Sequence, residues 1–277
     1  MSNTNEPLVS IIIPCYNHGD YLPEALESLL AQSFSKWEAI IVNDGSSDNT
    51  EKVALFYVNK DKRFKYLYQE NSKTSVARNY GIQKAKGLYI LPLDGDDKIA
   101  PDYLSSAVEF LEKNPSYTAY YSLVEFFGAK KGVWNLHYSS YKDELISNSI
   151  HISTVFRKSD CVAIGGFDET MRIGLEDWEF FIRLLYPDKK IYQEPKVLAY
   201  YRTTNTGMNR NTEALRFNDL VEAEIVKKHI DKYIEYWGNP LSIYRECFMR
   251  REWMNRTAPK LLINFLSRIQ LITDKFK

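Results

Sequence analysis

Three aspartates in one short segment are the residues of this sequence best suited to chemistry. Asp94, Asp96 and Asp97 lie within LPLDGDDKIAPDYL, residues 91 to 104, between an apolar run and a predicted helix. Like charges this close raise each other's pKa unless a positive group lies between them. Asp94 and Asp96 are two residues apart on a predicted turn, so both could bind one hard cation such as Mg²⁺ or Mn²⁺. Such an ion usually also binds substrate phosphates, so it would imply a phosphorylated ligand.

The sequence does not exclude purely structural roles for these residues. Asp97 or Asp102 near a helix start stabilises the helix without any ligand, and Asp-Gly-Asp also occurs in plain turns. Asp44, in VNDGSSD, could accept the N3–H of a uracil-like base or make an Asx turn into Gly45. These two roles are compatible with each other.

Two more side chains could contact a nucleotide. Tyr16, after IIIPC, could stack on a base, although an aromatic residue beside a strand is more often part of the packing. Arg78, in SVARN on a predicted helix, could meet a phosphate or pair with one of the aspartates. Tyr16 and Arg78 are therefore candidates for nucleotide binding that could also have a purely structural role.

A second pair of carboxylates lies farther along the chain. Glu176 and Asp177 begin a predicted helix whose apolar face includes Trp178. A carboxylate at a helix start is stabilised by the free N–H groups there, so a helix cap is one explanation. A base that acts on a sugar hydroxyl would also need an ionised aspartate, with an exposed tryptophan ring as a flat apolar face for the sugar. The sequence does not decide whether Trp178 is buried in the core or offers its ring to a sugar.

Alternating strands and helices must position these groups. Apolar periodicity predicts strands at residues 8–13, 37–42, 64–68 and 88–93 and helices at 21–32, 75–87 and 104–111. We expect Pro14 to stop the first strand, Gly87 to follow the end of a helix, and Ser47 or Asp48 to cap the helix after the second strand. This alternation predicts an α/β fold with right-handed crossovers and a mostly parallel sheet that carries helices on both faces.

The topology predicts where the candidate residues meet. Ligands of such sheets bind at the carboxyl ends of the strands. The loops at residues 14–20, 43–48 and 94–97 should therefore converge on one crevice. From about residue 115 to 205 the pattern changes to short strands that complete the same domain, and the rest reads as helices at 219–237 and 259–276.

Composition excludes several classes of protein. The chain of 277 residues has 36 Lys+Arg and 36 Asp+Glu, which does not suggest electrostatic binding of nucleic acid. Cys15, Cys161 and Cys247 show no CxxC spacing, which favours free thiols in a reducing compartment. The four histidines show no metal-ligand spacing, and no apolar run is long enough to span a membrane. A cytoplasmic protein is expected.

The C-terminal helices suggest a possible contact surface. Residues 241–277 contain eight Lys+Arg and three Asp+Glu, a local charge of +5. This basic amphipathic segment could touch an anionic membrane surface. Packing on the preceding part of the chain or on a second subunit is the alternative.

With these motifs in order, the sequence resembles the family 2 glycosyltransferases, which are inverting nucleotide-sugar enzymes of the Rossmann-like GT-A fold. The resemblance covers roughly residues 7 to 205 and rests on VSIIIPCYN, IIVNDGSSD, ARNYGI, LPLDGDD, GGFDE, EDWEFFIRL and YYR. It implies a catalytic domain at 1–205, with a nucleotide-binding half at about 7–113 and an acceptor-side half at 114–205. A helical extension would follow at 206–277.

The resemblance also implies roles for individual residues. The nucleotide would contact Pro14, Tyr16, Asn17, Asp44, Arg78, Asp94 and Gly95. Asp96, with Asp94, would hold Mn²⁺ or Mg²⁺, and Asp177 would be the catalytic base. Glu176 and Trp178 would contact the acceptor, a saccharide or a lipid-linked saccharide.

One departure from the family pattern concerns the metal. Relatives often have a histidine shortly after the YYR motif, whereas Thr203, Thr204 and Asn205 follow it here, so the third metal contact is not assigned. The expected donor is a nucleoside-diphosphate sugar, with UDP favoured by Asp44 alone. A glycoside hydrolase with paired carboxylates and a non-catalytic sugar-nucleotide-binding protein are the alternatives. A dinucleotide-dependent dehydrogenase is excluded, because no GxGxxG follows the first strand.

Overall fold

The computed structural model describes residues 6–171, 174–204, 212–239 and 242. The chain divides into two units, residues 1–223 and 224–277, and the boundary falls within helix α8. The helix predicted at 259–276, the basic segment apart from Ser242, and Cys247 lie outside the described residues. The membrane-contact hypothesis therefore stays a prediction.

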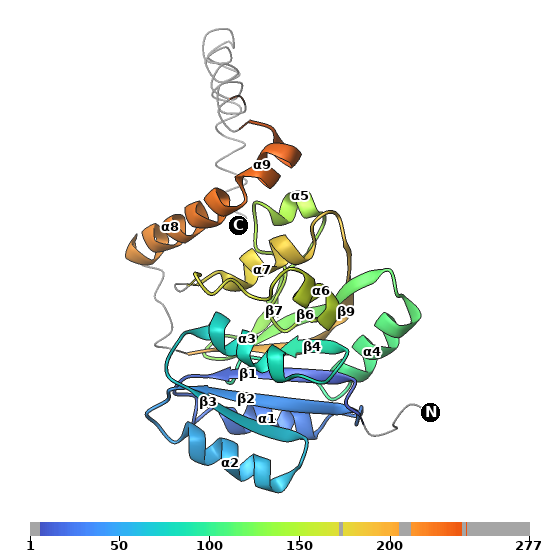
Figure 1. Ribbon diagram of the computed structural model, residues 1–277, viewed down its shortest axis with the longest axis vertical. Coiled ribbons are helices and arrows are strands. Elements are labelled where there is room, and N and C mark those ends of the chain that lie inside the picture. The colour runs from blue at the N-terminus through green and yellow to red at the C-terminus, as the bar shows by residue number, and fades with distance from the viewer. Residues whose placement is uncertain (1–5, 172–173, 205–211, 240–241, 243–277) are drawn as a thin grey trace. The chain divides into compact units, whose positions relative to one another are not determined.

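Within the described residues, the strands form a single nine-stranded mixed sheet in the order β3-β2-β1-β4-β8-β6-β9-β5, with β7 paired to β6 (Figure 1). The strands are β1 Val9–Cys15, β2 Trp37–Asp44, β3 Phe64–Gln69, β4 Tyr89–Pro92, β5 Lys98–Ile99, β6 Tyr117–Gly128, β7 Gly132–Trp134, β8 Val155–Arg157 and β9 Lys190–Thr203. The helices are α1 Leu22–Leu30, α2 Thr50–Lys60, α3 Thr74–Lys84, α4 Tyr103–Lys113, α5 Tyr141–Glu144, α6 Lys158–Ala163, α7 Glu176–Leu184, α8 Thr212–Lys228 and α9 Ile230–Trp237.

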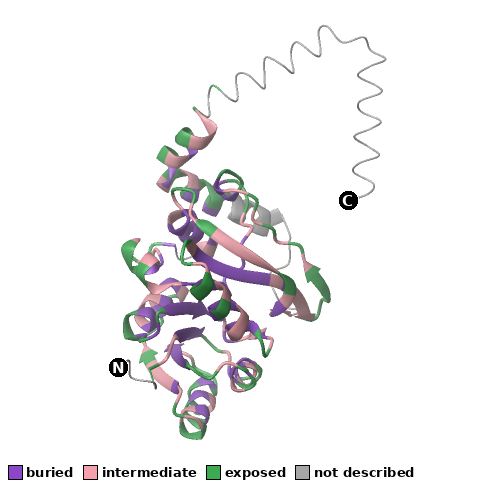
Figure 2. Ribbon diagram, turned by 90° about the vertical axis from the view of Figure 1, so that its right-hand side faces the viewer, coloured by how far each residue is buried: buried purple, intermediate pink, exposed green. Residues whose placement is uncertain are grey.

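The first half confirms the four predicted parallel strands. β1 pairs in parallel with β2 and β4, and β2 pairs in parallel with β3. Every residue of β1 and β2 is buried, as expected for strands covered on both faces (Figure 2). Ile11 and Ile13 belong to the same core cluster as Leu22 and Leu26 of α1, on one face of the sheet.

Helix α3 covers the opposite face, and a glycine sets its distance from the sheet. A Cβ atom at Gly81 would lie 2.6 Å from Cγ2 of Ile12 and 3.2 Å from Cγ2 of Val42. Only a residue without a side chain lets α3 approach β1 and β2 this closely. Since α3 carries Arg78, this approach also decides how deeply the arginine is buried.

Two local predictions about prolines and glycines were wrong. β1 continues through Pro14 to Cys15, because β4 pairs with β1 only as far as Ile12 and leaves an unpaired edge where proline is tolerated. Helix α3 ends at Lys84, so Gly87 does not follow its end directly. A Cβ atom at Gly87 would instead lie 2.7 Å from the backbone nitrogen of Ser10, so this glycine permits close backbone approach.

The second half differs from the predicted short strands. β6 has 12 residues and β9 has 14, and the two pair in parallel along most of their length. The sequence concealed β9 because Pro195 and several charged residues interrupt its alternation. β8 lies between β4 and β6 and pairs antiparallel with both, so the sheet is mixed beyond β4.

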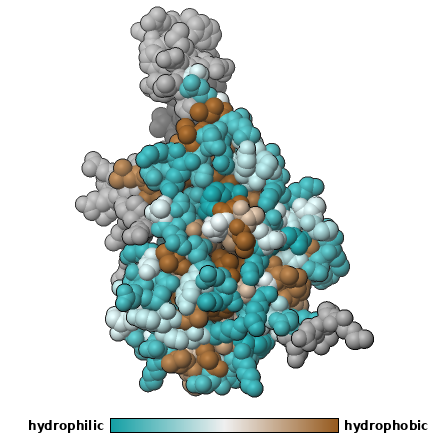
Figure 3. All heavy atoms as spheres, viewed as in Figure 1, coloured by the Kyte–Doolittle hydropathy of each residue, from teal (hydrophilic) through white to brown (hydrophobic). Residues whose placement is uncertain are grey.

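The predicted helix at 219–237 is divided into α8 and α9, which are separated at His229. None of the helices within the described residues combines the length and apolar character needed to cross a bilayer. On the face shown in Figure 3, hydrophobic residues appear in several separate patches among hydrophilic ones.

Candidate active site

The carboxyl ends of β1, β2 and β4 open on one cavity of about 350 Å³, as the topology predicted. It is lined by Pro14, Cys15, Tyr16, His18, Asp44, Thr74, Ala77, Arg78, Asp94, Asp96, Glu176 and Tyr201. Seven of these were predicted from the sequence, namely Pro14, Tyr16, Asp44, Arg78, Asp94, Asp96 and Glu176. Tyr16 is 51% exposed, so its ring is available to a ligand rather than used in packing.

Asn17 and Gly95 do not line this cavity but tie its loops together. The Asn17 backbone N–H donates to Ser46 Oγ at 2.9 Å, and Asn17 Oδ1 accepts from the backbone N–H of Ser47 at 2.8 Å. A Cβ atom at Gly95 would lie 2.7 Å from His18 Nδ1 and 2.8 Å from Cys15 Sγ. The acidic turn therefore packs directly on the first loop, and only glycine fits there.

The Asp44 carboxylate braces the loop before α3. Its Oδ1 accepts hydrogen bonds from Gln69 Nε2 and the Ser72 backbone N–H, both at 2.7 Å, and its Oδ2 accepts from the Lys73 N–H at 3.0 Å. These contacts replace the predicted Asx turn into Gly45. Lys73 has a positive φ of 79°, a backbone state that non-glycine residues rarely adopt, so the brace also holds a strained junction. Asp44 still borders the cavity beside Thr74 and Arg78.

Arg78 is the positive group within the carboxylate cluster. Its side chain is 2% exposed, and its guanidinium donates to Asp94 Oδ1 at 2.8 Å and to Glu176 Oε1 at 2.9 Å. Burial alone would raise the pKa of Asp94, but the charge and hydrogen bond of Arg78 outweigh it and lower that pKa. One cation thus joins the acidic turn after β4 to the start of α7, although 98 residues separate Arg78 from Glu176.

Within the described residues, neither of the other two aspartates of the turn makes an ion pair with a lysine or an arginine, and Asp97 Oδ2 lies 3.9 Å from His151 Nε2. Burial, followed by the charge of Asp94, raises the pKa of Asp96. Burial and the charges of both neighbours raise the pKa of Asp97 well above its usual range. Arg202 holds the turn in place, because its backbone N–H donates to Asp97 Oδ1 at 2.8 Å and its Nε donates to the Asp96 carbonyl at 2.9 Å.

The carboxylates of this site could hold a divalent cation only together with a bound ligand. Among the described residues, no three His, Cys, Asp or Glu side chains are grouped to hold a metal ion. Asp94 and Asp96 both border the cavity, which suits Mg²⁺ or Mn²⁺ completed by substrate phosphates and water. Thr203 is not available as a third ligand, since its hydroxyl donates to the Phe127 carbonyl at 3.1 Å and accepts from the Lys130 N–H at 2.7 Å.

Asp177 lies at the start of α7, next to the cavity-lining Glu176. Its Oδ1 accepts from the Trp178 backbone N–H at 2.8 Å and from Asn148 Nδ2 at 3.3 Å. Burial and the Glu176 charge raise the pKa of Asp177 to about 6, against the opposing charge of Arg78 and these hydrogen bonds. A carboxylate with such a pKa is ionised at neutral pH and basic enough to take a proton in catalysis.

The prediction of Trp178 as a platform for the acceptor was wrong. Its side chain is 5% exposed, and its indole Nε1 donates to the Glu144 carbonyl at 2.6 Å. A buried ring with its N–H already bonded has no free face for a sugar. Helix α7 is buried around most of its circumference, so the apolar face that includes Trp178 is part of the core.

Glu144 is a buried acid without an ion-pair partner in the described residues. Burial raises its pKa to about 8, with the Asp177 charge adding to the shift and Ser149 hydrogen bonds opposing it. Folding therefore costs free energy wherever the unfolded glutamate is ionised, a penalty that grows from the ordinary pKa of 4.5 up to about 8.

We expect Glu144→Gln to be more stable than the wild type by on the order of 1–3 kcal/mol near pH 8, and equal to it near pH 4. Glutamine keeps the shape but has no charge to bury. Urea unfolding at several pH values measures the difference, and Glu70→Gln, at an exposed glutamate, is the control. A stability difference that does not change with pH would contradict this assignment.

Beyond Cys15, Thr74 and Ala77, which also line the cavity, sequence reasoning missed three further residues of the site. His18 and Tyr201 line the cavity, and Arg202 holds the acidic turn. The YYR motif was a usable signal for Tyr201 and Arg202, since it lies at the end of β9. Nothing in the sequence distinguished His18 from the other histidines, because its place depends on the packing of Gly95 against it.

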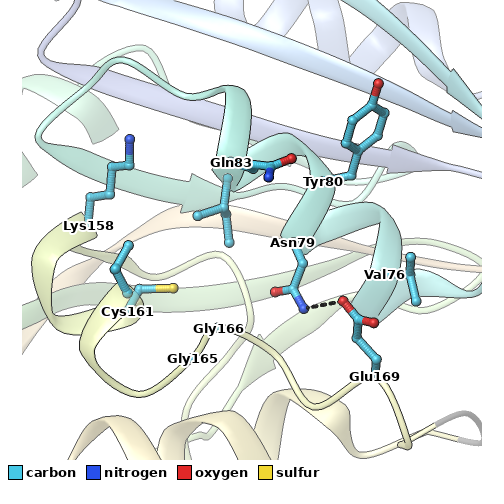
Figure 4. A pocket seen from close by; sticks show the side chains of 11 residues that line it. Val76, Asn79, Tyr80, Gln83, Lys158, Cys161, Gly165, Gly166 and Glu169 are labelled. Atoms are coloured by element: carbon cyan, nitrogen blue, oxygen red, sulfur yellow. Dashed lines mark hydrogen bonds between the residues drawn. The ribbon is translucent and has the colours of Figure 1, made fainter.

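A second cavity, of about 660 Å³, lies away from the carboxylates between α3 and the segment Lys158–Glu169 (Figure 4). Asn79 crosses its edge, where its Nδ2 donates to Glu169 Oε1 at 3.0 Å and to the Phe167 carbonyl at 2.8 Å. The lining is largely apolar and contains none of the acidic residues of the first cavity. Although it is larger, it offers no paired carboxylates, so the chemistry belongs to the smaller cavity.

Comparison with known proteins assigns the sequence pattern to one family. The family model described as Glycosyl transferase family 2 matches residues 10–166. An uncharacterized glycosyltransferase of Rickettsia typhi is 35% identical over 231 residues, which is 76% of this chain and 70% of that protein. TuaG of Bacillus subtilis, named as a teichuronic acid biosynthesis glycosyltransferase, is 32% identical over 245 residues, which is 84% of this chain and 96% of that protein.

Solved structures share the fold at low sequence identity. TarS 1-349 of S. aureus in complex with UDP-GlcNAc has a TM-score of 0.63 at 18% identity, over 91% of this chain and 76% of that chain. The mannosyltransferase PcManGT of Pyrobaculum calidifontis, in complex with GDP-Man and Mn²⁺, has a TM-score of 0.61 at 20% identity, over 84% of this chain and 65% of that one. These matches confirm the predicted GT-A type of α/β fold.

Proposed function

The chain belongs to glycosyl transferase family 2, and from this membership we propose that it transfers a sugar from a nucleoside-diphosphate sugar to an acceptor hydroxyl with inversion at the anomeric carbon. The observation that carries this proposal is the Arg78 bridge. One buried cation holds Asp94 of the acidic turn and Glu176, the neighbour of Asp177, on the same cavity. The residues proposed for the diphosphate and for the acceptor therefore border the same cavity.

In the proposed reaction, Asp177 takes the proton of the acceptor hydroxyl. The acceptor oxygen attacks the anomeric carbon from the side opposite the leaving group, and the bond from that carbon to the diphosphate oxygen breaks. Arg78, which lines the cavity, stabilises the negative charge that develops on the departing diphosphate. A single displacement of this kind inverts the anomeric configuration.

Asp94 and Asp96 are the residues proposed to hold Mn²⁺ or Mg²⁺. When bound, such a cation supplies positive charge to the diphosphate. The Mn²⁺ complex of PcManGT, with GDP-Man, supports this choice of cofactor. The nucleotide would lie against the exposed ring of Tyr16 and the edge formed by Pro14 and Asp44. UDP is the preferred nucleotide because Asp44 can accept a base N–H, and the UDP-GlcNAc complex of TarS supports it.

The proposed acceptor is a saccharide of a bacterial surface polymer, free or lipid-linked, which the name of TuaG supports. A glycoside hydrolase is the second candidate, since it also uses two carboxylates flanking the bond. No observation at this site favours it, because a hydrolase needs neither a buried arginine beside an acidic turn nor a nucleotide pocket. A non-catalytic binding protein is disfavoured, because Asp96 and Asp177 are both present and ionisable.

We expect UDP to bind at least about tenfold more tightly with Mn²⁺ than with chelator, because the ion offsets the repulsion between the diphosphate and the acidic turn. Titration calorimetry with UDP, GDP and dTDP measures this and ranks the nucleotides. Asp96→Asn should lose the metal-dependent part of the affinity, whereas the control Asp160→Asn, outside the cavity lining, should keep it. Equal UDP affinity with and without metal would refute the proposed donor site.

A further inference from the structure

The segment from Glu144 to Ser149 is tied to helix α7 by one hydrogen bond and closed on itself by others. The Trp178 indole donates to the Glu144 carbonyl at 2.6 Å, so the end of α5 is tied to α7. The Glu144 side chain accepts from the Ser149 hydroxyl and, at 3.3 Å, from the Ser149 backbone N–H. Glu144 thus closes the short loop on itself and leaves Asn148 little freedom to move.

This loop presents one side-chain donor to Asp177. Asn148 Nδ2 lies 3.3 Å from Asp177 Oδ1, which also accepts from the Trp178 backbone N–H at 2.8 Å. Within the described part of the chain, Asp177 Oδ2 accepts no hydrogen bond. Two donors on one oxygen fix the rotation of the carboxylate and leave the other oxygen free to accept a proton.

The remaining groups that face Asp177 are charged or titratable. Glu176 lies beside it on α7, Arg78 on α3 attracts it, and Glu144 and Tyr201 both feel its charge. The hydrogen bonds to its carboxylate come from its own helix and from Asn148. The orientation of the Asn148 amide follows from this contact, because the reversed amide would point its oxygen at a carboxylate.

We propose that Asn148 is a positioning residue for the Asp177 base, and that Glu144, Ser149 and the Trp178 indole form the support that holds Asn148 in place. This inference rests on the proposed function. Asn148 donates to the charged form of Asp177, directs Oδ2 towards the acceptor hydroxyl and keeps the carboxylate ionised at neutral pH. The buried Trp178 thereby has a role in catalysis that is indirect and does not involve stacking on a sugar.

The direct test is carbon-13 NMR of protein labelled at the aspartate side-chain carboxyl, which reports ionisation whether or not the enzyme is active. The Asp177 resonance is identified by its absence in Asp177→Asn. We expect Asn148→Ala to raise the titration midpoint of Asp177 by roughly one pH unit, because a donor to the charged form is lost. Asn148→Asp should raise it further, because it adds a second negative charge. The control Asn135→Ala, at an exposed asparagine outside both cavities, should leave it unchanged.

Kinetics supply the second readout. The acidic limb of the rate profile should move to higher pH in Asn148→Ala, with about a tenfold loss of kcat below the midpoint and a much smaller loss well above it. The KM for the donor should stay near the wild-type value, because Asn148 does not line the donor cavity. A purely structural role would instead lower the rate equally at every pH. Asn148→Ser, which is too short to reach Asp177, is the second variant if alanine prevents folding.

Two results would overturn the inference, and they differ from failure of the proposed function. An Asp177 midpoint in Asn148→Ala equal to that of Asn135→Ala would show that the contact does not act on Asp177. A parallel loss of rate at all pH values would show that Asn148 only supports the fold. A shifted midpoint in a protein that transfers no sugar would keep the contact between Asn148 and Asp177 but remove both the proposed function and the positioning of a base.

Discussion

Replacing Asp177 by asparagine is expected to lower the rate of sugar transfer by roughly 10³-fold, the usual effect of removing a general base. Asparagine keeps the shape of the side chain and can still accept from the Trp178 backbone N–H, but it cannot take a proton at neutral pH. Donor binding should remain, because Asp177 does not line the donor cavity.

The measurement pairs a transfer assay with calorimetric binding of UDP in the presence of Mn²⁺. In the wild type, activity should fall below about pH 6, because burial and the Glu176 charge raise the pKa of Asp177 to about 6 and only the ionised form can accept a proton. Asp160→Asn makes the same chemical change on α6 and should keep full activity. An Asp177→Asn protein with wild-type transfer would show that another group is the base.

Replacing Arg78 by leucine is expected to lower the free energy of unfolding by about 3 kcal/mol at neutral pH. The guanidinium is 2% exposed, whereas the side chains of Asp94 and Glu176 are 28% and 18% exposed, so water screens part of the loss. We therefore take the low end of the range for breaking a buried ion pair. Two carboxylates would be left close together with no cation between them.

The pKa of Asp94 determines how the stabilisation by Arg78 changes with pH. Arg78 outweighs burial and lowers the pKa of Asp94, so its stabilisation is present above the ordinary aspartate pKa and is lost as the pH falls. Urea unfolding should show the wild type and Arg78→Leu converging below about pH 4. Lys113→Leu, which breaks an exposed pair with Glu109, should change stability little at any pH. A neutral-pH loss no larger than that of Lys113→Leu would mean that Arg78 does not hold the cluster.

Much of the fold follows from short-range patterns. The runs LVSIII and WEAIIV are apolar except at Ser10 and Glu38, which is typical of strands covered on both faces, so both were predicted as strands of a parallel sheet. Once four such strands alternate with helices, the right-handed crossover rule leaves few arrangements. Because β1, β2 and β4 are parallel, their carboxyl ends lie at one edge of the sheet, so the meeting of Tyr16, Asp44 and Asp94 at one cavity was predictable.

The second half was less predictable because its pairing is long-range. β9 is 14 residues long and pairs with β6, about 70 residues earlier, and Pro195 with the charged residues around it interrupts the alternation that would have predicted a strand. Its last residues nevertheless bring Tyr201 to the cavity and Arg202 to the acidic turn. The strand is stabilised by its neighbour rather than by its own propensity.

The sequence by itself determined which residue types are available and at which strand ends they lie, because hydrophobic periodicity and crossover handedness are local properties. Only the tertiary structure decided their partners. The sequence left Arg78 to meet a phosphate or to pair with an aspartate; burial against the sheet pairs it with Asp94 and Glu176 while it still lines the cavity. Trp178 could have been a platform, but the chain near Glu144 covers it and in doing so brings Asn148 to Asp177. Such choices depend on contacts between segments tens of residues apart, and no pattern within one segment encodes them.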